Sequence, residues 1–177
     1  MLFARVASFF FAVLTFGLVA FANPVPNAEK RAVDPTTLVT NLQTKINGLT
    51  SQLSGITTNS AANEIKAQEV VTQIVTAIQE AQAQSQGGLL KRQTADAVAD
   101  VLSAIVTDVG TILAPVVVII PILGPLVTEI DVALNGLVVS LDVVVAGLVD
   151  TLDSLLVGVA GILNGLGLTL LLGTLGL

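Results

Sequence analysis

The side chains with the most chemical potential in the second half of this chain are carboxylates. The stretch from Gln93 to Leu177 has no Lys, Arg, His, Cys or aromatic residue, yet it carries eight acids. These are Asp96, Asp100, Asp108, Glu129, Asp131, Asp142, Asp150 and Asp153. Glu129 with Asp131, and Asp150 with Asp153, are close enough in sequence to act as pairs. Residues three apart share a helix face, so Asp150 and Asp153 suit a general acid–base pair or a bound cation.

Little else is present to complete such a site. The chain has no His and no Cys, which excludes imidazole and thiolate chemistry. A Ser nucleophile would have only carboxylates and the helix-borne Lys45 and Lys66 as candidate bases. Gly165 and Gly167 lie in a Leu-rich tail, so a phosphate-binding loop is not indicated. We therefore expect the acids to form the solvated edge of an apolar helix, in a non-enzymatic protein without catalytic residues, metal, cofactor or small-molecule substrate.

The first 22 residues have the pattern of a secretory signal. Arg5 precedes an apolar stretch from Phe9 to Ala20, and Ala20-Phe21-Ala22 is a small-x-small site that predicts cleavage after Ala22. The apolar run is short for a transmembrane anchor. All six Phe residues lie in this segment, and the chain has no Trp or Tyr, so residues 23–177 contain no aromatic side chain. The pattern predicts secretion.

Two dibasic pairs suggest further processing. Residues 23–31 are polar, contain proline and end in Lys30-Arg31, which predicts a pro-segment removed after Arg31. Lys91-Arg92 follows Gly87-Gly88 in an expected linker over 87–93. That second pair is either another cut, which would free the apolar half, or two charges that aid solubility.

The chain from Ala32 onward is acidic. It has four bases (Lys45, Lys66, Lys91 and Arg92) and twelve acids, so its formal charge is 4 − 12 = −8. This balance argues against nucleic acid and anionic membrane surfaces as partners. Small secreted domains usually contain disulfides, which this one lacks. We expect it to be held together by apolar burial, by assembly or by a surface that it binds.

Residues 32–86 predict a hairpin of two amphipathic helices. Asp34 is a suitable N-cap with Pro35 in the first helical position. One apolar seam with alternating spacing of three and four consists of Val39, Leu42, Ile46, Leu49, Leu53 and Ile56. A turn at 57–60 precedes a second seam of Ala67, Val71, Ile74, Ile78 and Ala81. The polar run QAQSQGG, residues 82–88, predicts a helix breaker that leads into the linker.

A third amphipathic helix is expected from Thr94, with Asp96 and Asp100 near its positive end. Its seam consists of Val98, Leu102, Ile105, Val109 and Ile112. Pro115 then interrupts it. Residues 115–125 remain open between the kinked end of a helix, an extended connector and a short buried strand.

An eleven-residue repeat follows: DVALNGLVVSL (131–141), DVVVAGLVDTL (142–152) and DSLLVGVAGIL (153–163), decaying over 164–174. Asp131, Asp142, Asp153 and Asn164 share its first position, and Gly136, Gly147 and Gly158 its sixth. Eleven residues make three helical turns, so the register predicts one long helix that is apolar on most sides and has a thin acidic stripe. The expected fold is thus all-α and bundle-like, with the hairpin and the third helix packing on this long helix beyond Leu126, and residues 94–177 together forming a strongly apolar helical half. If the three seams cover it only in part, a large apolar surface remains.

A membrane protein is the alternative. Val109–Val127 and Ser154–Leu177 are uncharged and long enough to span a bilayer. However, the first contains three prolines, five acids lie between the two, and basic or aromatic anchors are missing. Gly165–Leu177 also resembles the removed tail of a lipid-anchor signal, but the polar spacer expected before it is absent.

The layout resembles the cysteine-free secreted matrix and hyphal-surface proteins of mushroom-forming fungi: a signal, a segment ending in Lys-Arg, a polar helical half and a cysteine-free apolar half. Residues 32–86 bear a weaker resemblance to the fungal hydrophobic-surface-binding proteins. The first resemblance implies a structural role in aerial hyphae and attachment, alongside hydrophobins, although a chain without cysteine is not itself a hydrophobin. We therefore expect an amphiphile of the extracellular matrix or cell wall whose partners are copies of itself, apolar surfaces or lipid.

Overall fold

Helices make up most of what the computed structural model describes, which is residues 34–87 and 94–177. Within these ranges no residue belongs to a β-strand. They all lie in one compact unit, Ala32–Leu177, and the predicted all-α, bundle-like class is confirmed. The predicted signal and pro-segment, with Ala22, Lys30 and Arg31, and the second dibasic pair, Lys91 and Arg92, lie outside the described residues.

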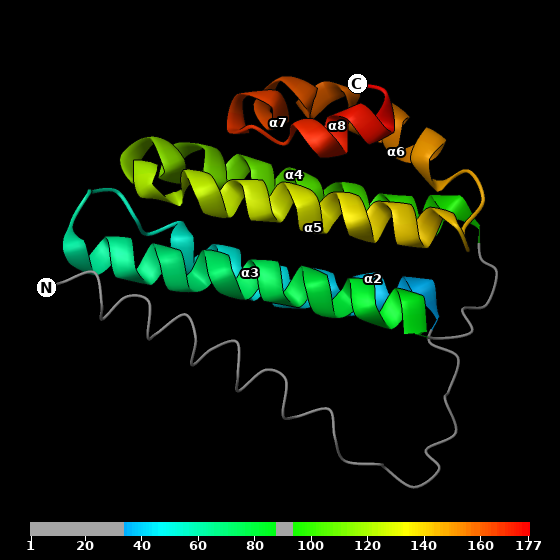
Figure 1. The fold of residues 1–177 in the computed structure, drawn as a ribbon, viewed down its shortest axis with the longest axis horizontal. Helices are drawn as coiled ribbons and strands as arrows, with labels where there is room; N and C mark the ends of the chain where they lie inside the picture. Colours follow the sequence, from blue (N-terminus) through cyan, green and yellow to red (C-terminus); the bar gives the residue numbers. More distant parts are fainter. Residues whose placement is uncertain (1–33, 88–93) are drawn as a thin grey trace, which may run out of the picture. The chain divides into compact units, whose positions relative to one another are not determined.

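Helices α2 (Pro35–Leu53) and α3 (Ala61–Gly87) form the predicted hairpin (Figure 1). The Asp34 carboxylate accepts a hydrogen bond from the Thr37 backbone N–H at 3.3 Å, and Pro35 stands in the first turn, as predicted. Both predicted seams are buried apart from Leu49, which is partly buried. The periodicity of the apolar residues therefore located this hairpin and its inner face correctly.

The predicted breaker at residues 82–88 is wrong for Gln82 to Gly87, because α3 continues through them. Ser85 is buried, and its hydroxyl lies 2.6 Å from the Ser140 hydroxyl on the facing helix. Polar composition favoured a loop, but packing against a neighbouring helix outweighs such local preferences.

Helix α4 (Ala95–Ile119) buries its predicted seam, with Ile112 only partly buried, and passes through Pro115. Pro115 lacks the N–H that would bond the Thr111 carbonyl, and Thr111 is exposed, so water can take that place. The helix ends at Ile120 (φ −124°, ψ 80°), where Pro121 disfavours the helical conformation. A short 3₁₀ turn, η1 (Pro121–Leu123), leads directly into the next helix. Residues 115–125 are therefore the end of a helix and a tight turn, and the strand alternative is wrong.

The single long helix expected beyond Leu126 is also wrong. The chain forms α5 (Gly124–Asp142), α6 (Leu148–Leu156), the 3₁₀ turn η2 (Val157–Val159), α7 (Ala160–Leu166) and α8 (Thr169–Leu175). Gly147 (φ 81°) precedes α6 and Gly167 (φ 96°) ends α7, both in the left-handed conformation that glycine adopts readily. Folding back buries leucines that a straight helix would leave in water.

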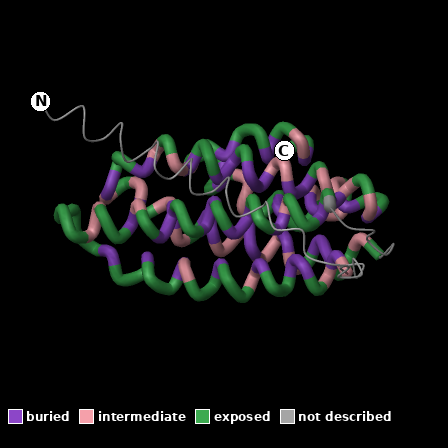
Figure 2. The backbone as a smooth tube through the Cα atoms, turned by 60° about the horizontal axis from the view of Figure 1, so that its bottom comes forward, coloured by how far each residue is buried: buried purple, intermediate pink, exposed green. Residues whose placement is uncertain are grey.

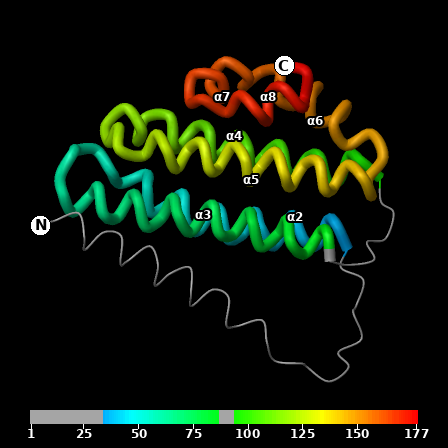
Figure 3. The backbone as a smooth tube through the Cα atoms, viewed as in Figure 1, coloured from blue at the N-terminus to red at the C-terminus, as the bar shows by residue number. Residues whose placement is uncertain are grey.

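These helices are arranged in three layers, which Figures 1 and 3 show in order from the hairpin to the C-terminus. Helix α2 packs on α4 and α3 packs on α5. On the other side of this middle layer, α6 and α7 pack on α4, and α8 packs on α5. Buried residues recur along the inner sides of all three layers in Figure 2, and they form one hydrophobic core.

Candidate functional site

The two carboxylate pairs do not form a reaction centre. Glu129 is exposed, whereas Asp131, two residues later on α5, is 2% exposed. Asp150 is exposed on α6, and Asp153 is partly buried. Among residues 34–87 and 94–177, no three Asp or Glu side chains gather as they would around a metal ion. The arrangement therefore gives these acids no shared chemistry.

Asp131 has a structural function that the sequence did not reveal. Its two carboxylate oxygens accept hydrogen bonds from the backbone N–H groups of Leu170 and Leu171, each at 2.9 Å. These N–H groups belong to the first turn of α8, where no partner exists within the helix. A residue 39 positions earlier in the chain thus caps α8 and fixes it against α5. The interpretation of the acids as a solvated edge is wrong for Asp131.

Two further polar side chains on the same face of α5 as Asp131 contact the C-terminal helices. The Thr174 hydroxyl donates to the Asn135 side-chain oxygen at 2.6 Å, one turn beyond the Asp131 contact. The Asp142 carboxylate accepts from the Val149 backbone N–H at 3.3 Å, at the start of α6. Asp131, Asn135 and Asp142 share one face of α5, but the predicted stripe is wrong beyond Asp142, because Asp153 lies on α6 and Asn164 on α7. The partners of the three α5 side chains are backbone and side-chain donors of α6 and α8.

The hairpin is joined to the middle layer by a second set of polar contacts. Besides the buried Ser85–Ser140 hydroxyl pair, Gln82 of α3 lies over Gly136 of α5. A Cβ at Gly136 would come within 2.5 Å of the Gln82 Nε2 atom. The absence of a side chain at Gly136 therefore leaves room on α5 for the Gln82 amide.

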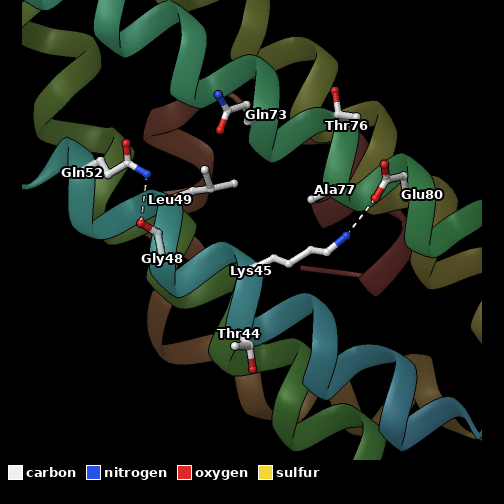
Figure 4. A pocket seen from close by; sticks show the side chains of 9 residues that line it. All are labelled: Thr44, Lys45, Gly48, Leu49, Gln52, Gln73, Thr76, Ala77 and Glu80. Atoms are coloured by element: carbon white, nitrogen blue, oxygen red, sulfur yellow. Dashed lines mark hydrogen bonds and ion pairs between the residues drawn. The ribbon is translucent and has the colours of Figure 1, made fainter. Parts of the chain in front are cut away.

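An open groove of about 490 Å³ lies between α2 and α3 on the hairpin (Figure 4). Leu49 and Ala77 contribute its apolar part, and its other sides are Gln, Thr and Gly. Lys45 reaches across to Glu80, with the Nζ and Oε2 atoms 2.9 Å apart, and both side chains are more than half exposed. Such an exposed pair contributes at most about 1 kcal/mol. The two ionisable side chains of the groove pair with each other in an exposed position, and the hydroxyls of Thr44 and Thr76 donate to backbone carbonyls of their own helices, so the groove does not indicate catalysis.

The most distinctive feature of the surface is the uneven distribution of exposed large apolar side chains. In α2 and α3 the only exposed one is Ile65. Residues 94–177 expose ten: Val118, Ile122, Val132, Val139, Val143, Leu155, Val157, Ile162, Leu170 and Leu177. Val118 and Val143 are more than 80% exposed. Among the described residues, exposed large apolar side chains are therefore concentrated in 94–177.

In the part of the chain that the structure describes, three helical segments are long and apolar enough to cross a membrane by length and composition: Ala95–Ile119, Pro121–Asp142 and Leu148–Leu166. They differ from the spans Val109–Val127 and Ser154–Leu177 expected from the sequence, because helix ends fall inside both of those stretches. Between 22% and 44% of each apolar window is buried against the rest of the molecule. The same helices therefore supply both the core and the apolar surface.

No family model matches this sequence, and no curated protein is similar to it. The function must therefore be inferred from the geometry of this chain. That geometry consists of a polar hairpin, a middle apolar layer and a C-terminal layer held by the stripe of Asp131, Asn135 and Asp142.

Proposed function

We propose that this protein is a secreted, non-enzymatic amphiphile that acts as a structural component of a cell surface or extracellular matrix, at boundaries between water and an apolar phase. The observation that carries the proposal is the unequal distribution of exposed apolar side chains, one on the hairpin and ten on residues 94–177. Such a molecule lowers its free energy when one side faces water and the other an apolar phase.

The composition of the two sides supports the same function. The exposed residues of α2 are Thr, Asn, Gln, Ser, Lys and Gly, which hydrate well. Residues 94–177 contain no base, so an anionic lipid surface does not attract them. Secretion is supported by the signal-like residues 1–22, and the fungal cell-surface resemblance suggests hyphae and their attachment sites as the location.

The proposal is tested by measuring the water contact angle of a surface coated with residues 32–177. We expect an apolar surface to become wettable, because the hairpin would face outward. Mass spectrometry of the extracellular protein would identify its termini and so test cleavage after Ala22, Arg31 and Arg92. An unchanged contact angle would contradict the amphiphile.

The second candidate is a membrane-inserting protein whose C-terminal half spans or perforates a bilayer, and the three long apolar segments favour it. Extraction of cell fractions at alkaline pH with carbonate distinguishes the two. A surface amphiphile is found in the medium or wall fraction and is released by carbonate. Retention in the lipid pellet, with none in the medium or wall, would support insertion instead.

A further inference from the structure

We propose that residues 148–177 form a lid, and that at an uncharged apolar surface this lid lifts off the middle layer and exposes the apolar faces of α4 and α5 to that surface. This inference rests on the proposed function and specifies which part of the molecule opens. The lid comprises α6, η2, α7 and α8.

The lid contacts one side of the middle layer only. Its packing is with α4, through α6 and α7, and with α5, through α6 and α8. The hairpin packs on the opposite side of the same two helices. Lifting the lid therefore leaves the α2–α4, α3–α5 and α2–α3 contacts in place, so the four long helices keep most of their mutual packing.

The faces under the lid are apolar. Gly110 of α4 lies directly beneath α7, since a Cβ there would come within 2.7 Å of the Leu163 Cδ2 atom. On α5, Asp131 marks the lid-facing side through its bonds to α8. Helical spacing puts other buried apolar residues on the same two faces. On α4 these are Ala99, Val106 and Leu113. On α5 they are Val127, Leu134 and Val138.

Helices α4 and α5 are not among the closely packed helix pairs, and the lid packs on both of them. Leucines of the lid are buried over them: Leu148, Leu152, Leu156, Leu163, Leu171, Leu172 and Leu175. An apolar phase can replace these leucine side chains without a loss of hydrophobic stabilisation, because the free energy of burying apolar area does not depend on the direction of the contact.

Three polar side chains of α5, Asp131, Asn135 and Asp142, hold the lid closed in water, and we call them the latch. Directional bonds to Leu170, Leu171, Thr174 and Val149 fix the lid in one position. Asp131 accepts two hydrogen bonds at 2.9 Å, whereas Asp142 accepts one at 3.3 Å, so Asp131 is the strongest part of the latch.

The connection to the lid has the features of a hinge. Residues 143–147 form a turn between α5 and α6, with Val143 83% exposed and Gly147 at φ 81°. Hinges are a few residues at element ends that absorb changes in φ and ψ. Rotation here moves the whole lid without unfolding α5.

Two engineered disulfides in the full-length chain test the inference, since the chain has no other cysteine. Asn135→Cys with Thr174→Cys joins the lid to α5 where the two side chains are bonded. Ser85→Cys with Ser140→Cys is the matched control, because it joins the hairpin to α5 where the two hydroxyls are 2.6 Å apart. Adsorption of each oxidised and reduced protein to a clean air–water interface is followed by surface tension.

We expect the lid disulfide to slow adsorption by about tenfold or more, with recovery on reduction, and the hairpin disulfide to have no such effect. The inference is overturned if the lid disulfide adsorbs as fast as its reduced form, or if only the hairpin disulfide slows adsorption. If the wild-type protein itself does not lower surface tension, the proposed function fails together with the lid. If the wild-type protein does lower it and the lid disulfide has no effect, only the lid fails.

A variant of the latch gives an independent test that needs no disulfide. Asp131→Asn keeps the side-chain shape but removes the charge and one acceptor, and Asp150→Asn makes the same charge change at an exposed position. We expect Asp131→Asn to shorten the adsorption lag by about tenfold and Asp150→Asn to leave it unchanged. Hydrogen exchange of the Leu170 and Leu171 amides should accelerate in the same variant. Equal lags for both variants, with unchanged exchange, would contradict the latch.

Discussion

The hairpin of α2 and α3 and the apolar half over 94–177 share one hydrophobic core but differ in how they end their helices and what they expose. The hairpin consists of long uninterrupted helices with one apolar seam each and a polar outer surface. The apolar half is divided by glycines, and carboxylates cap its short helices from a distance. An amphipathic seam therefore suffices to define a helix, whereas a chain that is apolar on most sides needs specific polar contacts to define its path.

Substitutions in the shared core should have the largest effect on the free energy of unfolding, and they test whether the two regions fold as one unit. Ile74→Ala in α3 and Leu134→Ala in α5 each remove a fully buried side chain, and we expect each to lower the free energy of unfolding by about 2–5 kcal/mol. Because the core is continuous, both variants should shift a single transition. Chemical denaturation followed by circular dichroism measures this, since residues 32–177 lack aromatic fluorescence. Two separate transitions, each sensitive to one variant only, would show that the regions fold independently.

The distant cap should give the next largest effect. Asp131→Ala leaves the N–H groups of Leu170 and Leu171 without their acceptor, and we expect a loss of about 2–4 kcal/mol. Asp150→Ala, at an exposed position on α6, should change stability by less than about 0.5 kcal/mol. Equal stabilities for the two variants in urea denaturation would remove the cap from the account of how the apolar half folds.

The polar contact between the two regions should have a smaller effect. Ser85→Ala removes one member of the buried hydroxyl pair, and we expect a loss of about 0.5–1.5 kcal/mol. Ser51→Ala is a suitable control, because Ser51 is exposed and its hydroxyl bonds within α2. A double-mutant cycle with Ser140→Ala measures the coupling, and a coupling energy near zero would mean that the pair does not join the regions.

Effects of similar size but opposite sign are expected for glycines of the two regions. Gly48 lies inside α2, and an alanine Cβ at this position would have nothing within 4 Å, so Gly48→Ala should raise stability by about 0.5–1 kcal/mol. Gly147 has φ 81°, so Gly147→Ala should lower stability by about 1–2 kcal/mol. Thermal unfolding measures both changes. A stabilising Gly147→Ala would be inconsistent with the left-handed turn before α6.

The sequence predicted the seams of α2, α3 and α4 and the cap at Asp34 because those signals are local. It did not predict the path beyond Leu126. A register of Asp and Gly every eleven residues fits a continuous helix, yet Asp also caps other helices and Gly also adopts positive φ. Which alternative applies depends on whether the lid can bury its leucines on α4 and α5, and this is a property of the whole fold. The helical continuation of α3 through Ser85 is likewise decided by its contact with Ser140.

The central claim is that the apolar half, and not the hairpin, faces an apolar phase. Residues 23–177 contain no aromatic side chain, so one introduced Trp reports on its own surroundings. Val139→Trp places it at an exposed position on α5, and Thr76→Trp at an exposed position on α3. On adding alkane droplets to residues 32–177, we predict a blue-shifted Trp emission for Val139→Trp and an unchanged emission for Thr76→Trp. An equal shift in both variants, or a shift in Thr76→Trp alone, would contradict the account.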